Sequence, residues 1–247
     1  MGEKSNIEWT NDTWNPWHGC KKVTEGCKFC YMYREKDRYN QDGAEVKRST
    51  PSTFNKPMSF EGPLVFTCSW SDFFIDAADE WRSDAWKIIE NTPWLTYQIL
   101  TKRPERIMDN LPGGWGRGWE NVWLGVSIEN EKNMYRLRYL NGVRAKVKFV
   151  SFEPLLGPID VLSHEWMKGI DWVVIGGESG NDDGPWGYRD CEMGWIRKLV
   201  FDCQSLGIKV FVKQLGTGLA KSIGASRHGK VMEEWPEVIR VREIPEH

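Results

Sequence analysis

The chain alternates short apolar runs with polar or amphipathic segments. Six runs are rich in β-branched or aromatic residues and do not alternate apolar with polar positions; they occupy residues 63–68, 94–100, 121–126, 146–150, 172–175 and 208–212. Continuous apolar runs of this length are typical of strands that are buried on both faces, as in a parallel sheet. We predict a seventh, more polar strand near Ile7–Thr10.

Helical patterns lie between several of these runs. Residues 79–90, 130–139 and 194–206 place apolar side chains at helical spacing, and residues 31–39 are compatible with a further helix. Strands that alternate with helices indicate βαβ units and a mostly parallel α/β sheet. Six or seven such units fit a partial or full (β/α) barrel, in which the chemistry lies on the loops that follow the strands.

The pattern predicts one barrel-like domain over residues 1–247. Within it we expect a cysteine-bearing loop at 10–31, an irregular connection at 40–59 and a C-terminal loop or flap at 216–247. Residues 238–241 are predicted to form a short strand in that flap.

Composition narrows the function classes. The 247 residues are 40% hydrophobic and 28% charged with a net charge of −2, so any nucleic-acid contact needs a local basic patch. No apolar run approaches the roughly 18 residues of a membrane span, and no secretory signal begins the chain. We therefore expect a cytoplasmic protein without membrane contact. Among the 15 tryptophans, some are expected in the core and others against flat ligands.

Three of the six cysteines lie within eleven residues, at Cys20, Cys27 and Cys30. In a reducing compartment, clustered thiols more often bind metal or do chemistry than form disulfides. Three thiolates suit an iron–sulfur cluster with one open iron, which can bind a small molecule. Two alternatives stay open: a structural zinc site with His18 as fourth ligand, and three unrelated cysteines.

The segment Cys27-Lys28-Phe29-Cys30 resembles the end of the radical S-adenosylmethionine (SAM) signature. The resemblance implies a [4Fe–4S] cluster on the three cysteines, SAM at the open iron, Phe29 near the adenine, and an external one-electron donor. Six residues separate Cys20 from Cys27, whereas that signature usually has three.

The whole chain resembles the phage-associated Gp37/Gp68 family, a divergent radical SAM-like branch. The resemblance rests on residues 14–20, 25–27, 100–106, 123–127, 153–158, 176–180 and 213–214. It implies a phage protein or a bacterial host, and it makes a DNA base or modified nucleotide the first expected substrate, with a peptide or small molecule as alternatives. Basic side chains expected at phosphates are those of Arg136, Arg138, Arg144, Lys146 and Lys148.

Polar residues follow most of the predicted strands. As catalytic groups we expect Lys213, Glu153 and Glu178, and as cofactor-binding groups Lys102, Arg103, Ser127, Glu129, Asn130, Gly176, Gly177 and Ser69. Plainer roles stay open for several of them: a tight turn at Gly176–Gly180, a surface pair at Lys102–Arg103, and a helix cap at residues 127–130.

Two rival functions also stay open. One is a non-catalytic, zinc-stabilised module that binds nucleic acid or protein. The other is an iron–sulfur protein that does not use SAM and takes its fourth ligand from His18 or Cys68.

Overall fold

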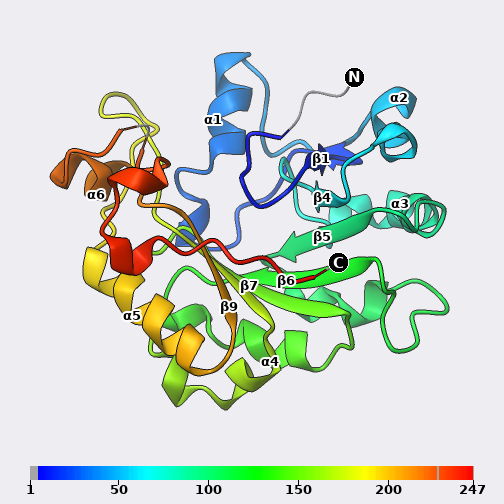
Figure 1. The fold of residues 1–247 in the computed structure, drawn as a ribbon. Helices are drawn as coiled ribbons and strands as arrows, with labels where there is room; N and C mark the ends of the chain where they lie inside the picture. The colour runs from blue at the N-terminus through cyan, green and yellow to red at the C-terminus, as the bar shows by residue number, and fades with distance from the viewer. Residues whose placement is uncertain (1–4, 227, 247) are drawn as a thin grey trace.

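The computed structural model describes residues 5–226 and 228–246. Seven parallel strands form one sheet that curls into a half-barrel (Figure 1). In spatial order they are β1 (Asp12–Trp14), β4 (Leu64–Thr67), β5 (Thr96–Thr101), β6 (Val122–Ser127), β7 (Val147–Phe152), β8 (Trp172–Gly176) and β9 (Lys209–Gln214). The spatial order follows the chain order, so the predicted α/β class and partial-barrel architecture are confirmed.

Helices flank this sheet (Figure 1). They are α1 (Tyr31–Arg38), α2 (Pro51–Phe54), α3 (Asp79–Glu90), α4 (Arg136–Asn141), α5 (Met193–Ser205) and α6 (Thr217–Ser222). A small antiparallel pair, β2 (Trp17–His18) with β3 (Lys47–Arg48), lies outside the main sheet. The 40–59 connection thus contains β3 and α2, which the polar sequence did not predict.

Both faces of the sheet are buried. Strand residues such as Leu124 and Val173 pack with the apolar sides of the flanking helices in one large core. Their alternate neighbours, among them Trp123, Phe149 and Trp172, form a second cluster on the opposite, inner face, where Trp9 joins them. Burial on both faces explains why the strands appear in the sequence as continuous apolar runs.

The first strand lies later than predicted. Ile7–Thr10 is not a strand; β1 begins at Asp12 and pairs only with β4. An edge strand with one partner tolerates polar residues, so its sequence lacks the apolar signal of the other strands.

The C-terminal segment covers the opposite edge of the sheet. Residues 237–239 form a 3-10 helix rather than the predicted strand. Beyond it, the Val212 amide donates to the Val241 carbonyl at 2.8 Å, and the Glu243 amide donates to the Val210 carbonyl at 2.8 Å. The segment therefore satisfies backbone groups along β9 that would otherwise be unpaired.

No helix in the described ranges has the length and apolar character needed to span a membrane.

Candidate functional site

The three clustered cysteines lie between β1 and α1, at the carboxyl edge of the sheet. Cys20, Cys27 and Cys30 are all free thiols and all partly buried. Cys30 directly precedes the first residue of α1. The Tyr33 hydroxyl, one turn into this helix, donates to the Cys20 carbonyl and so joins the two ends of the loop.

The three thiols and the Tyr33 hydroxyl influence one another electrostatically. Burial raises the pKa of the Cys20 thiol to about 12, and Asp72 and Cys27 add to the rise. Burial also raises the pKa of Cys30, and Cys27 again contributes. The pKa of the Tyr33 hydroxyl is raised to about 12. Burial is the largest cause, and the nearby thiols of Cys20, Cys30 and Cys27 add to it. The thiols therefore lie within mutual electrostatic reach.

Within residues 5–226 and 228–246, no three His, Cys, Asp or Glu side chains are arranged to hold a single metal ion. An iron–sulfur cluster makes a different demand, because each thiolate binds a different iron and the sulfurs need not converge on one point. Three free thiols on one loop match that donor set. The residues present thus fit a cluster by type, number and location.

Glu129, just after the end of β6, holds the cysteine loop in place. Its side chain is fully buried; it accepts from the Thr24 hydroxyl at 2.9 Å and from Arg136 at 3.0 Å. A Cβ on Gly26 would lie 2.4 Å from Glu129 Cγ, so the loop approaches as closely as glycine allows. Glu129, expected to bind cofactor, is fully committed to protein partners.

Lys102 and Asn130 also hold this loop. The Lys102 ammonium lies 3.6 Å from Glu129 Oε1, and the Lys102 side chain is 22% exposed. Asn130 Nδ2 donates to Glu25 Oε1 at 2.8 Å. Asn130 is also the N-cap residue of the short 3-10 helix at Glu131–Asn133, but its side chain makes no capping hydrogen bond there. Ser127 is buried on β6, where its carbonyl accepts from Arg136 at 2.5 Å.

Arg103 joins the cysteine loop to two strand ends. Its Nη1 lies 3.8 Å from Cys20 Sγ and donates to Asp72 Oδ2 at 3.1 Å, while Nη2 donates to the Lys21 carbonyl at 2.8 Å. Arg103 is therefore neither an exposed surface residue nor a free cation waiting for an anionic ligand.

Lys213 and Glu153 form an ion pair across the sheet. Lys213 Nζ donates to Glu153 Oε1 at 2.9 Å, with the side chains 22% and 15% exposed. Gly176 lies on β8 between their strands, and a Cβ there would come within 2.5 Å of Glu153 Oε1. The structure thus brings together three residues that the sequence proposed separately.

Glu178 is held by Arg189, a residue that no sequence motif pointed to. Two guanidinium nitrogens contact the two carboxylate oxygens at 2.8 and 2.6 Å. A third nitrogen of Arg189 donates to the Glu25 carbonyl at 2.9 Å, and the guanidinium lies 5.5 Å from the Phe29 ring centroid. Arg189 therefore links the loop after β8 to the cysteine loop.

Two other expected cofactor groups have structural contacts. A Cβ on Gly177 would lie 2.1 Å from the Leu215 carbonyl oxygen, so this glycine permits a close approach of two backbones. Ser69 Oγ accepts from Asn15 Nδ2 at 2.9 Å, and its carbonyl accepts from the Tyr31 hydroxyl. Ser69 thereby ties the β4 loop to both ends of the cysteine-bearing segment.

Several further expectations need correction. Arg136 cannot contact phosphate, because it is fully buried against Glu129. Lys146 pairs with Glu120 at 2.6 Å, and it lies beside the amino end of β7, away from the cysteines. Six of the tryptophans are almost completely buried and therefore belong to the core: Trp9, Trp14, Trp17, Trp123, Trp172 and Trp235.

The two residues considered as fourth ligands have other surroundings. His18 Nδ1 lies 3.0 Å from Lys36 Nζ, and burial, followed by the Lys36 charge, lowers the pKa of this histidine. Cys68 is 3% exposed within the large core, and burial raises the pKa of its thiol well above the usual value.

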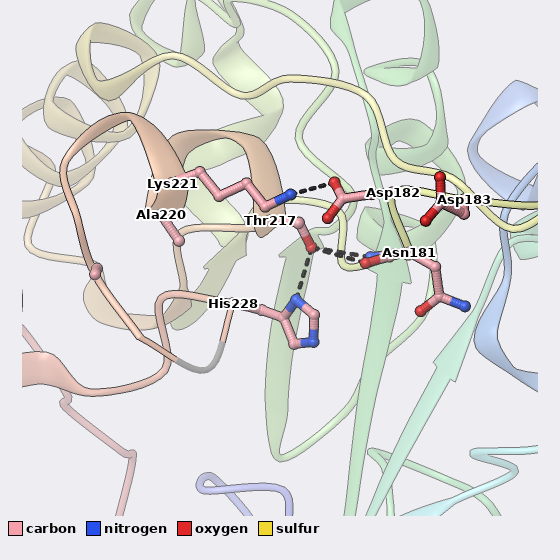
Figure 2. A pocket seen from close by; sticks show the side chains of 9 residues that line it. Asn181, Asp182, Asp183, Thr217, Ala220, Lys221 and His228 are labelled. Atoms are coloured by element: carbon pink, nitrogen blue, oxygen red, sulfur yellow. Dashed lines mark hydrogen bonds and ion pairs between the residues drawn. The ribbon is translucent and has the colours of Figure 1, made fainter.

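A cavity of about 630 Å³ opens beside the β8 loop and α6 (Figure 2). His228 Nδ1 lies 2.7 Å from the Thr217 hydroxyl in its wall, and Lys221 pairs with Asp182. None of the residues predicted to be functional lines this cavity.

A family model described as "Protein of unknown function (DUF5131)" matches residues 4–237. The chain belongs to this family. The match includes all seven strands of the half-barrel and the three clustered cysteines, so the DUF5131 family is defined over the whole sheet and its cysteine loop. Neither the curated proteins nor the solved structures include a significant match to this DUF5131 protein.

Proposed function

We propose that this DUF5131 protein is a radical SAM-type enzyme whose Cys20, Cys27 and Cys30 hold a [4Fe–4S] cluster. One observation carries the proposal: three free, partly buried thiols occupy the segment between the first strand and the first helix of a parallel half-barrel. The carboxyl edge of such a sheet is where α/β barrels do chemistry.

The resemblance to the Gp37/Gp68 family supports the same reading. Its motifs at residues 100–106, 153–158 and 176–180 all lie where strands β5, β7 and β8 end or just beyond. Segments far apart in the chain thus meet at the edge that carries the cysteines.

The bound cluster and SAM would supply one-electron cleavage and a radical that abstracts hydrogen from substrate. The chain's own residues would orient SAM and shield the cluster from water. Lys213 and Glu153 present one cation and one anion side by side, which matches the zwitterionic methionyl end of SAM. Phe29, within the cysteine loop, offers a partly buried ring for the adenine.

For substrate we propose a nucleobase or modified nucleotide, a choice that rests on the phage resemblance. The contacts to its phosphates would come from the cysteine edge, where Lys22 and Lys28 are exposed. They would not come from Arg136, which is buried.

The test is anaerobic reconstitution followed by iron, sulfide and zinc analysis and an assay for 5′-deoxyadenosine with dithionite and SAM. We expect about four irons per chain and deoxyadenosine formation that is lost in Cys27→Ala. Cys203→Ala, which removes a buried thiol of α5 far from the loop in sequence, is the matched control and should keep both. Stoichiometric zinc without iron would instead identify a zinc-stabilised binding module.

A further inference from the structure

We propose that Arg103 is a positioning residue that tunes the cluster: it donates a hydrogen bond to the Cys20 sulfur and raises the reduction potential. This inference rests on the proposed function, because it concerns the cluster on Cys20, Cys27 and Cys30.

The contact is specific to one cysteine. Arg103 Nη1 lies 3.8 Å from Cys20 Sγ, and the same guanidinium donates to the Lys21 carbonyl at 2.8 Å. In the part of the chain that the structure describes, neither Cys27 nor Cys30 receives a hydrogen bond from a guanidinium. The Arg103 side chain is only 11% exposed, so water screens its charge weakly.

Asp72 fixes the guanidinium in place. Its Oδ2 accepts from Arg103 at 3.1 Å and from the Lys102 amide at 2.9 Å. Its Oδ1 accepts from the Thr101 hydroxyl at 2.7 Å and from the Phe74 amide at 2.9 Å. With both carboxylate oxygens anchored, Asp72 holds Arg103 against the cysteine loop whether or not a ligand is present.

The direction of the effect follows from charge. Reduction adds one electron to the cluster, and a buried cation that donates to a ligand sulfur stabilises the more negative state. Loss of Arg103 should therefore lower the potential. Asp72 partly offsets the cation in net charge, but it has no hydrogen bond to sulfur; the donor to Cys20 is Arg103 alone among the described residues.

The experiment is a redox titration of the reconstituted full chain, with the reduced cluster followed by electron paramagnetic resonance. Arg103→Gln removes the charge and the donor fork. We expect its reduced-to-oxidised ratio at a fixed potential to fall about tenfold, which corresponds to about 59 mV for one electron. Arg103→Lys, which keeps the charge but not the planar fork, should give a smaller fall in the same direction.

Lys21→Gln is the matched control. It removes a cation from the residue next to Cys20, but the Lys21 ammonium points to Asp76 at 3.7 Å and is 58% exposed. Its ratio should change less than threefold. If Arg103→Gln behaves like Lys21→Gln or like the wild type, the inference is wrong.

The outcomes separate the two proposals. A wild-type chain that takes up no iron overturns the proposed function itself. A wild-type cluster whose potential does not respond to position 103 overturns only the role of Arg103. Should Arg103→Gln fail to load iron, Arg103→Lys decides: a lowered potential supports the role and a wild-type value refutes it.

Discussion

At the scale of single residues, the site is built around buried charges with fixed partners. Glu129 and Arg136 are both fully buried and 3.0 Å apart. Removing one member of such a pair leaves the other charge uncompensated, which costs more than the pair itself contributes. Because Glu129 also holds Thr24, the cost extends to the cysteine loop.

We therefore predict that Arg136→Met lowers the free energy of unfolding by about 3–5 kcal/mol. Urea unfolding followed by tryptophan fluorescence measures this loss. Arg138→Met on the same helix removes an exposed arginine and should change the stability by less than about 0.5 kcal/mol. Equal effects of the two variants would contradict a buried pair.

Residue roles were predicted less well than residue locations. The sequence correctly predicted that Lys102, Arg103 and Glu129 lie at strand ends. It also predicted that they bind a ligand, whereas in the structure they contact protein groups. Their actual partners, Asp72, Thr24 and Arg136, come from other segments of the chain, and a sequence does not state which of two charges will be buried together. Arg189 was missed altogether, because it contacts Glu25 across a separation of 164 residues and belongs to no motif.

At the scale of elements, charges also fix how helices begin. Asp79 opens α3 and accepts from Arg82 at 2.6 Å and from Arg106 at 2.7 Å. Burial alone would raise the pKa of Asp79, but the hydrogen bonds from the two arginines outweigh it and lower the pKa. A folded-state pKa below the unfolded value means that the ionised form stabilises the fold.

The resulting stability is present above the unfolded pKa of about 3.8 and is lost as pH falls through the lower folded value. We predict that Asp79→Asn lowers the free energy of unfolding at pH 7 by up to about 1 kcal/mol, typical of a half-exposed pair. The difference from the wild type should shrink as pH falls below about 4. Denaturant unfolding across this pH range checks the prediction.

Glu80→Gln is the matched control for the helix start. It removes a carboxylate from the same first turn, yet Glu80 is exposed and forms no ion pair in the described structure. A pH dependence equal to that of Asp79→Asn would mean that the helix dipole, and not the arginines, stabilises Asp79.

The elements that the sequence predicted best are those buried on both faces. Strands β4 to β9 and helices α3 and α5 lie within about two residues of their predicted ranges, because an uninterrupted or periodic apolar pattern is the strongest local signal of secondary structure. β1 was misplaced because it is a three-residue edge strand. α6 was missed because Gly218 lies inside it and Gly216 and Gly224 flank it, a glycine pattern that is typical of a loop.

At the scale of the whole molecule, a half-barrel leaves a sheet edge that must be covered. Residues 241–243 pair with β9, and Trp235 in the same C-terminal segment is 1% exposed and donates a 3.1 Å hydrogen bond to the Gly229 carbonyl. Arg242 adds a cation over the rings of Trp235 and Phe211, at 5.3 and 5.4 Å. The sequence did not show that this segment closes an edge, because its backbone bonds with β9 are irregular.

Trp235→Ala should therefore act on the fold and on association together. Emptying this buried site is expected to cost about 3–5 kcal/mol. Loosening the segment would free backbone donors and acceptors on β9, and unpaired strand edges promote association between chains. Urea unfolding should show the loss of stability, and size-exclusion chromatography should show larger species.

Val238→Ala truncates a side chain of the same segment that is 60% exposed, and it should leave both measurements near the wild type. A Trp235→Ala protein that is destabilised but elutes unchanged would show that the bonds of Val241 and Glu243 hold the cover without its anchor.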